Sequence, residues 1–455
     1  LFMIKRDLYH ELLTWKSKPE RKPLIIRGAR QVGKTTLVKS FSEEFDYFIY
    51  LNLEVKGDFI IFEENNSLEQ IVTLLYFKNK VPKNPKNKVL LFIDEIQNSS
   101  NAIRFLRYFY EEHNHIHVIA AGSLLESVLD NKFSFPVGRV EYLLLRPFSF
   151  HEYLIAKEMN HVLEALKTIP VPDYAHLVLK ETFKEYVIIG GMPEIVMNFV
   201  KNTDLVRIGD IYQSLLTVYL DDVEKYAKSA VQVNIIRHVI ESVMRLAGER
   251  IKFEGFGNSN YKSKDISEAM RTLEKTFLIR LMYPTTMVKK PALVNKRKSP
   301  KLQLLDTGLL NHFAQIQEDL LIGDNIDTVF EGKVAEHIVG QELMSLIKLP
   351  LVQNLFWVKE KKQSNAEIDY LIFHESDIHP IEVKLGKTGR LRSLSEYMDL
   401  SASKVAVRVY SGELRIDQVK TLRGRPYFLL NLPFYLVHKI YDYLTWVKKE
   451  SAYQT

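Results

Sequence analysis

The chain has 455 residues, 46% of them hydrophobic, which supplies enough core for roughly two to four domains. Its 62 Lys and Arg against 56 Asp and Glu give a formal net charge of +6, which permits nucleic-acid binding without indicating it. The absence of cysteine excludes disulfides and thiolate metal sites. No apolar run approaches the length of a membrane span, so we expect a cytoplasmic protein with no membrane partner.

A phosphate-binding loop is the first motif along the chain. After a helix expected over residues 3–20, the apolar run 23–26 predicts a short strand and 36–41 a helix, and the G-x-x-x-x-G-K-[ST] pattern lies between them. Backbone N–H groups of such a loop cradle phosphate oxygens, Lys34 reaches the β- and γ-phosphates, and Thr35 holds Mg²⁺. The alternative is a glycine-rich turn with an incidental lysine. We predict ATP and Mg²⁺ as ligands, and the nucleotide-binding residues are Gly28, Ala29, Arg30, Gln31, Val32, Gly33, Lys34, Thr35 and Thr36.

A second element of the same site lies in residues 89–95, an apolar run that ends in Asp94 and Glu95. Such a run is typical of a central parallel strand, and ligands bind at the carboxyl ends of these strands. We therefore expect Asp94 to bind Mg²⁺ through water and Glu95 to orient the attacking water. An ordinary Asp-Glu cap at the end of a strand is the alternative.

Two further candidate residues lie at the end of a third apolar strand, which begins at His117, and after it. Ser123 ends this strand, and Arg139 interrupts an otherwise apolar stretch. An arginine at this position can stabilise transition-state charge, in its own subunit or in a neighbour. A structural pairing of Arg139 with a carboxylate is an equal alternative.

The order of these motifs resembles a known family. The residues that carry the resemblance are Gly28 to Thr35, Ile93-Asp94-Glu95-Ile96-Gln97, Ala121-Gly122-Ser123, Gly138-Arg139, Arg146-Pro147-Phe148-Ser149-Phe150 and Gly190-Gly191-Met192-Pro193-Glu194. They are similar to prokaryotic AAA-superfamily ATPases that carry a C-terminal domain of unknown function. The resemblance implies that Ser123 contacts the γ-phosphate or the lytic water, and an ordinary turn serine is the alternative. It also implies a P-loop NTPase core of the AAA type, a helical lid, a winged-helix segment and a nuclease-like C-terminal fold.

The pattern of elements gives an α/β fold class and four expected domains. Residues 22–150 alternate strands and helices, and residues 151–228 are mostly helical, with breaks at 169–172 and 190–193. The expected domains are an ATPase core at 1–150, a helical lid at 151–228, a winged-helix domain at 229–318 and a restriction-endonuclease-like α/β domain at 319–455.

The winged-helix segment carries a basic stretch. Helices are expected from 235 to 247 and from 263 to 277, followed by a hairpin of 278–283 with 301–305. No acidic residue lies between Glu274 and Asp306. Phosphate-backbone contact with DNA is one interpretation, and a solvated wing or a docking surface is the other. The basic residues of this stretch are Lys275, Arg280, Lys289, Lys290, Lys296, Arg297, Lys298 and Lys301.

The last third of the chain contains a second group of charged residues. Asp369 and Glu382 fall on adjacent strands of an expected hairpin, and Glu382 and Lys384 share one face of a strand. With Glu336 on a preceding helix, this arrangement resembles the PD-(D/E)xK nuclease core. In that family the acids bind Mg²⁺ and the lysine positions the attacking water. The alternative is a structural domain whose charges pair internally.

These observations predict an ATP-binding and ATP-hydrolysing AAA-type enzyme that acts on DNA or is regulated by it, with a metal-dependent nuclease domain. Two alternatives remain. One is a nucleotide-dependent switch whose C-terminal domain only recognises partners. The other is a remodelling ATPase that works as a homo-oligomeric ring, in which Arg139 reaches a neighbour's nucleotide.

Overall fold

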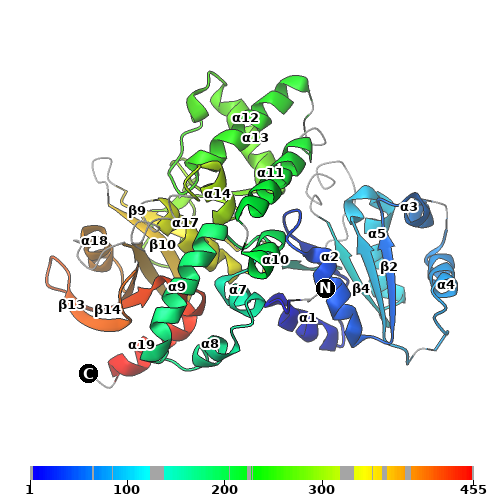
Figure 1. Ribbon diagram of the computed structural model, residues 1–455, viewed down its shortest axis with the longest axis horizontal. Coiled ribbons are helices and arrows are strands. Elements are labelled where there is room, and N and C mark those ends of the chain that lie inside the picture. Colours follow the sequence, from blue (N-terminus) through cyan, green and yellow to red (C-terminus); the bar gives the residue numbers. More distant parts are fainter. Residues whose placement is uncertain are drawn as a thin grey trace. The chain divides into compact units, whose positions relative to one another are not determined.

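The chain forms two compact units in the computed structural model (Figure 1). The first unit comprises Leu1–Arg146 with Lys275–Phe277 and Ile347–Leu351, and the second comprises Pro147–Glu274, Leu278–Leu346 and Val352–Thr455. The expected boundary near residue 150 lies close to the division between them, whereas those near 228 and 318 fall inside the second unit. The structure describes residues 4–63, 66–84, 86–122, 138–203, 205–222, 227, 229–317, 333–350, 352–360, 366–384 and 391–452.

A parallel five-stranded sheet in the order β2-β3-β4-β1-β5 organises the first unit. Because neighbouring strands all run parallel, their carboxyl ends meet at one edge. Every residue of β3 and β4 is buried, as the apolar runs predict for central strands. The strands are β1 (Leu24–Arg27), β2 (Tyr47–Asn52), β3 (Val89–Asp94), β4 (Ile116–Ala121) and β5 (Glu141–Leu144).

Helices cover both faces of this sheet. Ile71 of α4 and Leu106 of α5 join Val118 of β4 in one hydrophobic cluster. The neighbouring residue of β4, His117, faces the other side, where the ring of Trp15 from α1 lies 5.9 Å from it. The helices are α1 (Leu8–Ser17), α2 (Lys34–Phe41), α3 (Lys56–Glu63), α4 (Leu68–Lys78) and α5 (Ser100–Glu112), with short 3₁₀ turns η1 (Ser42–Glu44) and η2 (Ile96–Asn98).

The second unit begins with a run of helices whose breaks fall where the sequence predicts them. Gly190 has a φ of +69° and ends α9, and a Cβ on Gly191 would lie 2.1 Å from the Phe148 carbonyl oxygen. Both positions therefore require glycine. The helices are α7 (Phe150–Ala156), α8 (Asn160–Ala165), α9 (Asp173–Ile189), α10 (Pro193–Asn202), α11 (Leu205–Asp222), α12 (Ala230–Leu246), η4 (Phe256–Asn258), α13 (Ser263–Lys275) and α14 (Thr307–Phe313).

A mixed seven-stranded sheet follows, in the order β13-β14-β12-β11-β10-β9-β7. Strands β10 and β11 form the antiparallel hairpin that the sequence predicts, and β11, β12 and β14 run parallel. The strands are β7 (Pro284–Thr285), β9 (Leu355–Val358), β10 (Glu367–His374), β11 (Asp377–Val383), β12 (Val405–Tyr410), β13 (Arg415–Lys420) and β14 (Pro426–Pro433). They are accompanied by α17 (Lys333–Ser345), α18 (Arg392–Leu400), η5 (Phe434–Lys439) and α19 (Ile440–Ala452).

The segment expected as a free wing is instead built into this sheet. Strands β6 (Ile279–Met282) and β8 (Lys301–Leu304) pair antiparallel, as predicted, but β7 in the loop between them pairs with β9. The indole N–H of Trp357 donates to the carbonyl of Thr286 at 3.3 Å. Val288 and Ala292 pack against the hydrophobic cluster that contains Trp357. Apolar contact with the sheet thus fixes the base of the basic loop.

A buried carboxylate ties the helical run to the later part of the second unit. Glu342 of α17 is 1% exposed, and its Oε1 accepts from the Phe150 N–H at 3.1 Å and from the Tyr186 hydroxyl at 2.9 Å. Such a cluster is stable only while its partners stay in place. The expected lid and the expected nuclease-like domain therefore share one polar core.

Candidate functional site

The backbone of the phosphate loop is shaped by two glycines. Gly28 has a φ of +153°, and a Cβ there would lie 2.2 Å from the carbonyl oxygen of Leu145. Gly33, with a φ of +91°, precedes the first turn of α2. A side chain at either position would be strained, so the loop can approach its neighbours only with glycine. The loop leads directly into the eight-residue helix α2, and the backbone N–H groups at the amino end of a helix favour anions.

Lys34 is buried against its own loop. Its Nζ donates to the carbonyl oxygens of Gly28 at 3.1 Å and Ala29 at 2.8 Å, and the residue is 7% exposed. Burial lowers the pKa of Lys34 to about 8, although the carboxylates of Glu95 and Asp94 raise it. Among the residues that the structure describes, no carboxylate pairs directly with this ammonium. Its two neutral acceptors can be exchanged for phosphate oxygens.

Thr35 and Asp94 bring the phosphate loop and the end of β3 together. The Thr35 hydroxyl donates to Asp94 Oδ2 at 2.6 Å, and the Glu95 N–H donates to Asp94 Oδ1 at 3.1 Å. Burial raises the pKa of Asp94, and the hydrogen bond from Thr35 partly offsets this. A hydroxyl beside a carboxylate is a donor set that Mg²⁺ accepts, so these residues fit the ion.

Glu95 follows β3 in a left-handed backbone conformation with a φ of +52°. This conformation is uncommon for residues other than glycine and recurs at functional positions. The Gln97 side-chain amide donates to Glu95 Oε2. The carboxylate beside Asp94 is therefore held by a specific partner.

Tyr50 is a member of this site that the sequence did not identify. Its hydroxyl donates to Asp94 Oδ2 at 3.4 Å, and its ring stacks on Phe92 with centroids 5.5 Å apart. Burial, followed by the Asp94 charge, raises the pKa of Tyr50 to about 12. The contact depends on the pairing of β2 with β3, which no local pattern reveals.

Arg6, also missed, supports the phosphate loop from the segment before α1. Its guanidinium donates to the Val32 carbonyl oxygen at 2.9 Å and to the Arg146 carbonyl oxygen at 2.6 Å. The residue is 7% exposed. Because Arg6 lies beside Lys5 and Asp7, the sequence resembles a solvated helix start and gives no signal of this role.

Of the two remaining residues proposed for this site, the structure describes only Arg139. Ser123 lies outside the described residues. Arg139 is described, and its Nε pairs with Glu111 Oε1 at 2.9 Å, with 44% of its side chain exposed. Glu111 also binds Arg107 at 3.0 Å. Arg139 thus makes the carboxylate pairing that the sequence left open, and its action on a neighbour's nucleotide stays a prediction.

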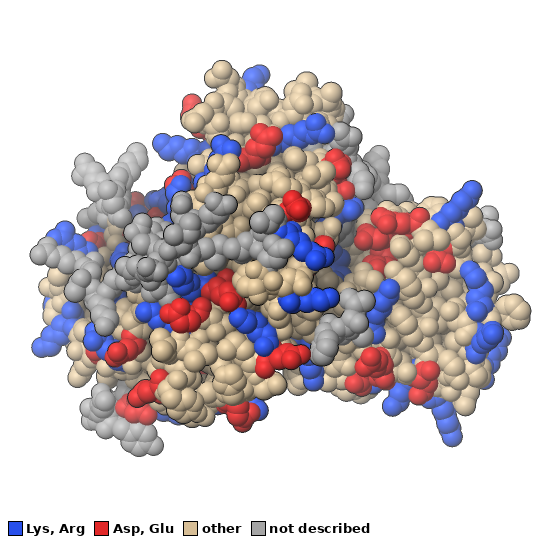
Figure 2. All heavy atoms as spheres, viewed as in Figure 1, with Lys and Arg blue, Asp and Glu red and all other residues tan. Residues whose placement is uncertain are grey.

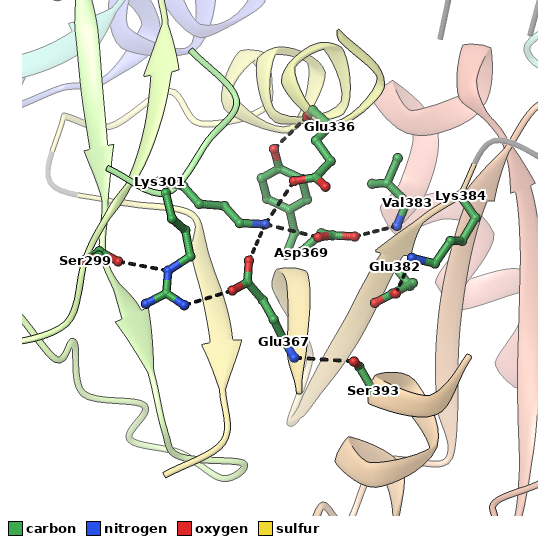
Figure 3. Close-up of polar contacts among 11 residues, drawn as sticks. Ser299, Lys301, Glu336, Glu367, Asp369, Glu382, Val383, Lys384 and Ser393 are labelled. Atoms are coloured by element: carbon green, nitrogen blue, oxygen red, sulfur yellow. Dashed lines mark hydrogen bonds and ion pairs between the residues drawn. The ribbon is translucent and has the colours of Figure 1, made fainter. Parts of the chain in front are cut away.

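The residues proposed for the nuclease-like site lie on α17, β10 and β11, with Lys384 directly after the end of β11 (Figure 3). The register that pairs Tyr370 with Ile381 places Asp369 next to Glu382. Lys384 Nζ pairs with Glu382 Oε1 at 2.8 Å, and the Val383 N–H donates to Asp369 Oδ2 at 2.9 Å. The sequence therefore identified residues that do lie together.

The position between the acids is taken by Lys301, which enters from β8 (Figure 3). Its Nζ lies 3.0 Å from Glu336 Oε2, 2.9 Å from Glu367 Oε1 and 3.1 Å from Asp369 Oδ1. Burial lowers the pKa of Lys301, but the three carboxylates outweigh it and hold the pKa well above the usual value. The sequence places Lys301 among the basic residues available for DNA contact. This prediction is wrong, because Lys301 is only 5% exposed.

This geometry does not fit a divalent metal. Within the described ranges, no group of three His, Asp or Glu residues is placed to hold a metal ion. Each expected ligand already pairs with a lysine through one of its oxygens: Glu336 and Asp369 with Lys301, and Glu382 with Lys384. Glu367 was not predicted, although it stands two residues before Asp369 on one strand, the same spacing that linked Glu382 and Lys384.

Glu382 itself carries an unusual charge state. Burial raises its pKa to about 7, with Asp369 adding to the shift and Lys384 opposing it. Its second oxygen, Oε2, is buried without a hydrogen-bond partner among the described residues. Glu382 is therefore a buried carboxyl group with one oxygen paired to Lys384 and the other without a partner among the described residues.

The basic loop between β7 and β8 presents its charges to solvent. Lys289, Lys290, Lys296 and Arg297 are exposed, and Lys290 Nζ donates to the Glu375 carbonyl oxygen at 2.9 Å. Over the face shown in Figure 2, Lys and Arg are interspersed with Asp and Glu. The face shown therefore carries no continuous basic patch.

Comparison with protein families assigns a class to the first unit. Residues 20–154 match a family model described as an AAA domain, which supports an AAA-type ATPase. Residues 180–320 and 331–427 match two domains of unknown function, DUF8612 and DUF4143. The ATPase part of the sequence prediction is supported, while the winged-helix and nuclease-like parts are not confirmed.

Individual relatives are distant. The chain is 24% identical over 461 residues to the uncharacterized protein MJ1544 of Methanocaldococcus jannaschii, covering 95% of this chain and 90% of the relative. The Walker-type ATPase PABY2304 of Pyrococcus abyssi aligns with a TM-score of 0.43 at 13% identity, covering 68% of this chain and 95% of that one. The Aeropyrum pernix ORC1 protein, solved in complex with DNA, aligns with a TM-score of 0.26 at 12% identity over 68% and 90%. These likenesses add no argument about ligands.

In the part of the chain that the structure describes, no helix is both long and apolar enough to cross a membrane.

Proposed function

We propose that the chain binds ATP with Mg²⁺ at the phosphate loop and hydrolyses it. The observation that carries this proposal is the 2.6 Å hydrogen bond between Thr35 and Asp94, which joins the loop to the acidic end of β3. Two distant segments of sequence thereby form one oxygen-rich position beside a buried lysine. The match of residues 20–154 to an AAA domain supports the same reaction.

Each residue has a distinct task in this reaction. The loop N–H groups and Lys34 bind the phosphates, and Thr35 and Asp94 hold Mg²⁺, which when bound neutralises phosphate charge. Glu95 orients the water that attacks the γ-phosphate. Ser123 and Arg139 are proposed to contact the γ-phosphate side, Ser123 in the same subunit and Arg139 in its own subunit or in a neighbouring one of a homo-oligomer.

Two substitutions test the ATPase proposal. Lys34→Ala should abolish tight nucleotide binding, and Glu95→Gln should keep binding while reducing turnover by about 100-fold or more. Binding is measured with a fluorescent ATP analogue and turnover by phosphate release. Lys78→Ala, which removes the same charge from the exposed end of α4 in the same unit, is the matched control and should behave as wild type. Unchanged turnover in both site variants would exclude this site.

A role for DNA is the second candidate, favoured by the exposed loop. Lys289, Lys296 and Arg297 have no carboxylate partner within the described residues, so their charges are available for phosphate oxygens. Contact with the phosphate backbone would bind nucleic acid weakly and without sequence preference. This interpretation leaves the later part of the second unit as a recognition element, since its acids do not fit a metal.

Fluorescence anisotropy with labelled duplexes of different sequence tests this role. Replacing Lys296, Arg297 and Lys298 together by alanine should weaken all duplexes equally and lower the salt slope by up to about three phosphate contacts. Replacing Lys83, Lys86 and Lys88 removes the same charge from an exposed loop of the first unit and should change little. If the wild type fails to bind at low salt, the basic loop is a docking surface for protein.

A further inference from the structure

The ammonium of Lys301 is matched to its surroundings atom by atom. It has three N–H donors, and it faces one oxygen from each of Glu336, Glu367 and Asp369 at 2.9 to 3.1 Å (Figure 3). These are hydrogen-bond distances of an ammonium, whereas Mg²⁺ requires oxygens at about 2.1 Å. The acids are thus spaced for the nitrogen that lies between them.

The strand that carries Lys301 is held on both sides. The next residues of β8 are anchored: Gln303 donates to the His337 carbonyl oxygen at 2.9 Å, and the Leu304 N–H donates to His337 Nε2 at 3.1 Å. On the other side, the Leu302 N–H donates to the Glu249 carbonyl oxygen at 2.8 Å. These bonds fix the backbone of β8, and with it the Cα from which Lys301 reaches the three acids.

A second cation reinforces the cluster from its edge. Arg250 Nη1 pairs with Glu367 Oε2 at 3.2 Å, while its Nε donates to the Ser299 carbonyl oxygen at 3.3 Å. Two fixed cations, Lys301 and Arg250, thereby contact the three carboxylates. A divalent ion that entered beside them would meet the positive charge of Lys301 within the same small space.

We propose that Lys301 is the permanent counter-cation of the cluster formed by Glu336, Glu367 and Asp369, so that this part of the chain works without a divalent metal. The lysine takes the position that the resemblance to nucleases assigns to Mg²⁺. It also links the hairpin of β6 and β8 to the seven-stranded sheet. The cluster serves as a structural junction, and metal-dependent cleavage is not its task.

The test is a gain of metal binding by the full-length chain. Without nucleotide, wild type should show no Mn²⁺ site at this cluster by calorimetry or by electron paramagnetic resonance. Lys301→Met should bind one Mn²⁺ at least tenfold more tightly than wild type, and adding Asp369→Asn should remove the gain. Lys448→Met is the matched control, because Lys448 also pairs with two carboxylates, Glu375 and Asp377, but at the surface.

The outcomes separate cleanly. A folded Lys301→Met chain that fails to bind Mn²⁺ overturns the proposal, as does wild-type binding that Asp369→Asn abolishes. If Lys301→Met does not fold, wild type and Lys301→Arg decide the question. Both proteins keep the cation, so adding Mn²⁺ or EDTA should leave their thermal unfolding midpoints unchanged. A midpoint shift on adding Mn²⁺ that disappears in Asp369→Asn would refute the role of Lys301 as the permanent counter-cation.

Discussion

The two units each bury a lysine, and the two environments are opposites. Lys34 donates to the carbonyls of Gly28 and Ala29, and burial lowers its pKa to about 8. Lys301 is surrounded by carboxylates that hold its pKa well above the usual value, although burial lowers it. The first ammonium is poorly satisfied and suited to an incoming anion, and the second is already paired. In this chain, the buried lysine with neutral partners belongs to the phosphate loop, and the one with charged partners lies in an ion-pair cluster.

The largest expected effect is a difference in stability between matched variants of the two lysines. Lys301→Met should destabilise the second unit by about 3 to 5 kcal/mol, because it leaves buried carboxylates without their cation. Lys34→Met should cost the first unit little, because it removes a poorly solvated charge. Calorimetric unfolding measures both, with Trp15 and Trp357 fluorescence to identify the unit that melts. Equal losses in the two variants would contradict the comparison.

The charge of Lys34 gives a second test, through protons. At pH 8.5 most of the free protein should have a neutral Lys34, since its pKa is about 8. Bound phosphates raise that pKa, so ATP binding should take up roughly half to three quarters of a proton at pH 8.5. At pH 6.5 the lysine is charged in both states, and this uptake should vanish. Calorimetry in buffers of different ionisation enthalpy measures it, and Lys34→Arg should abolish it.

Arg6 tests whether the phosphate loop depends on support from outside. Arg6→Met removes the bonds to the Val32 and Arg146 carbonyls, and ATP affinity should fall by about tenfold, which corresponds to about 1.4 kcal/mol. Lys5→Met is the control, since Lys5 is exposed. An affinity equal to wild type would show that the loop holds its shape without the guanidinium.

The smallest expected effect belongs to Tyr50. Its hydroxyl lies 3.4 Å from Asp94 Oδ2, near the limit of a hydrogen bond, while its ring is held by stacking on Phe92. Tyr50→Phe should therefore lower ATP turnover by about threefold or less, with binding unchanged. Steady-state kinetics can detect this difference. A loss approaching that of Glu95→Gln would assign the hydroxyl a direct task in hydrolysis.

Sequence reasoning succeeded where the signal is local. The parallel strands, the breaks at 169–172 and 190–193 and the hairpin of β6 with β8 follow from apolar runs, prolines and glycines. It also selected Asp369, Glu382 and Lys384, because period-two spacing on a strand sets which side chains share a face. These are properties of single elements or of neighbouring ones.

It failed where residues meet only through tertiary structure. Lys301 and Asp369 are 68 positions apart, and nothing in either segment indicates their ion pair. Lys301 was grouped with exposed basic residues because composition describes a stretch and not the direction of each side chain. Arg6 and Tyr50 likewise contact the phosphate-loop site only through tertiary structure. Arg6 reaches the Val32 carbonyl by packing, and Tyr50 reaches Asp94 because β2 pairs with β3.

The short strand β7 has a consequence for solubility. A sheet edge with free backbone groups invites pairing with another chain, which leads to aggregation. Here β7 covers β9, and it is only Pro284–Thr285, whose proline has no N–H to offer a further strand. The opposite edge, β13, carries charged residues at both ends, Arg415 and Lys420. Deleting the whole segment between β6 and β8 to remove its basic charges would also remove β7 and uncover β9, so charge-removing substitutions are the safer route to studying this protein.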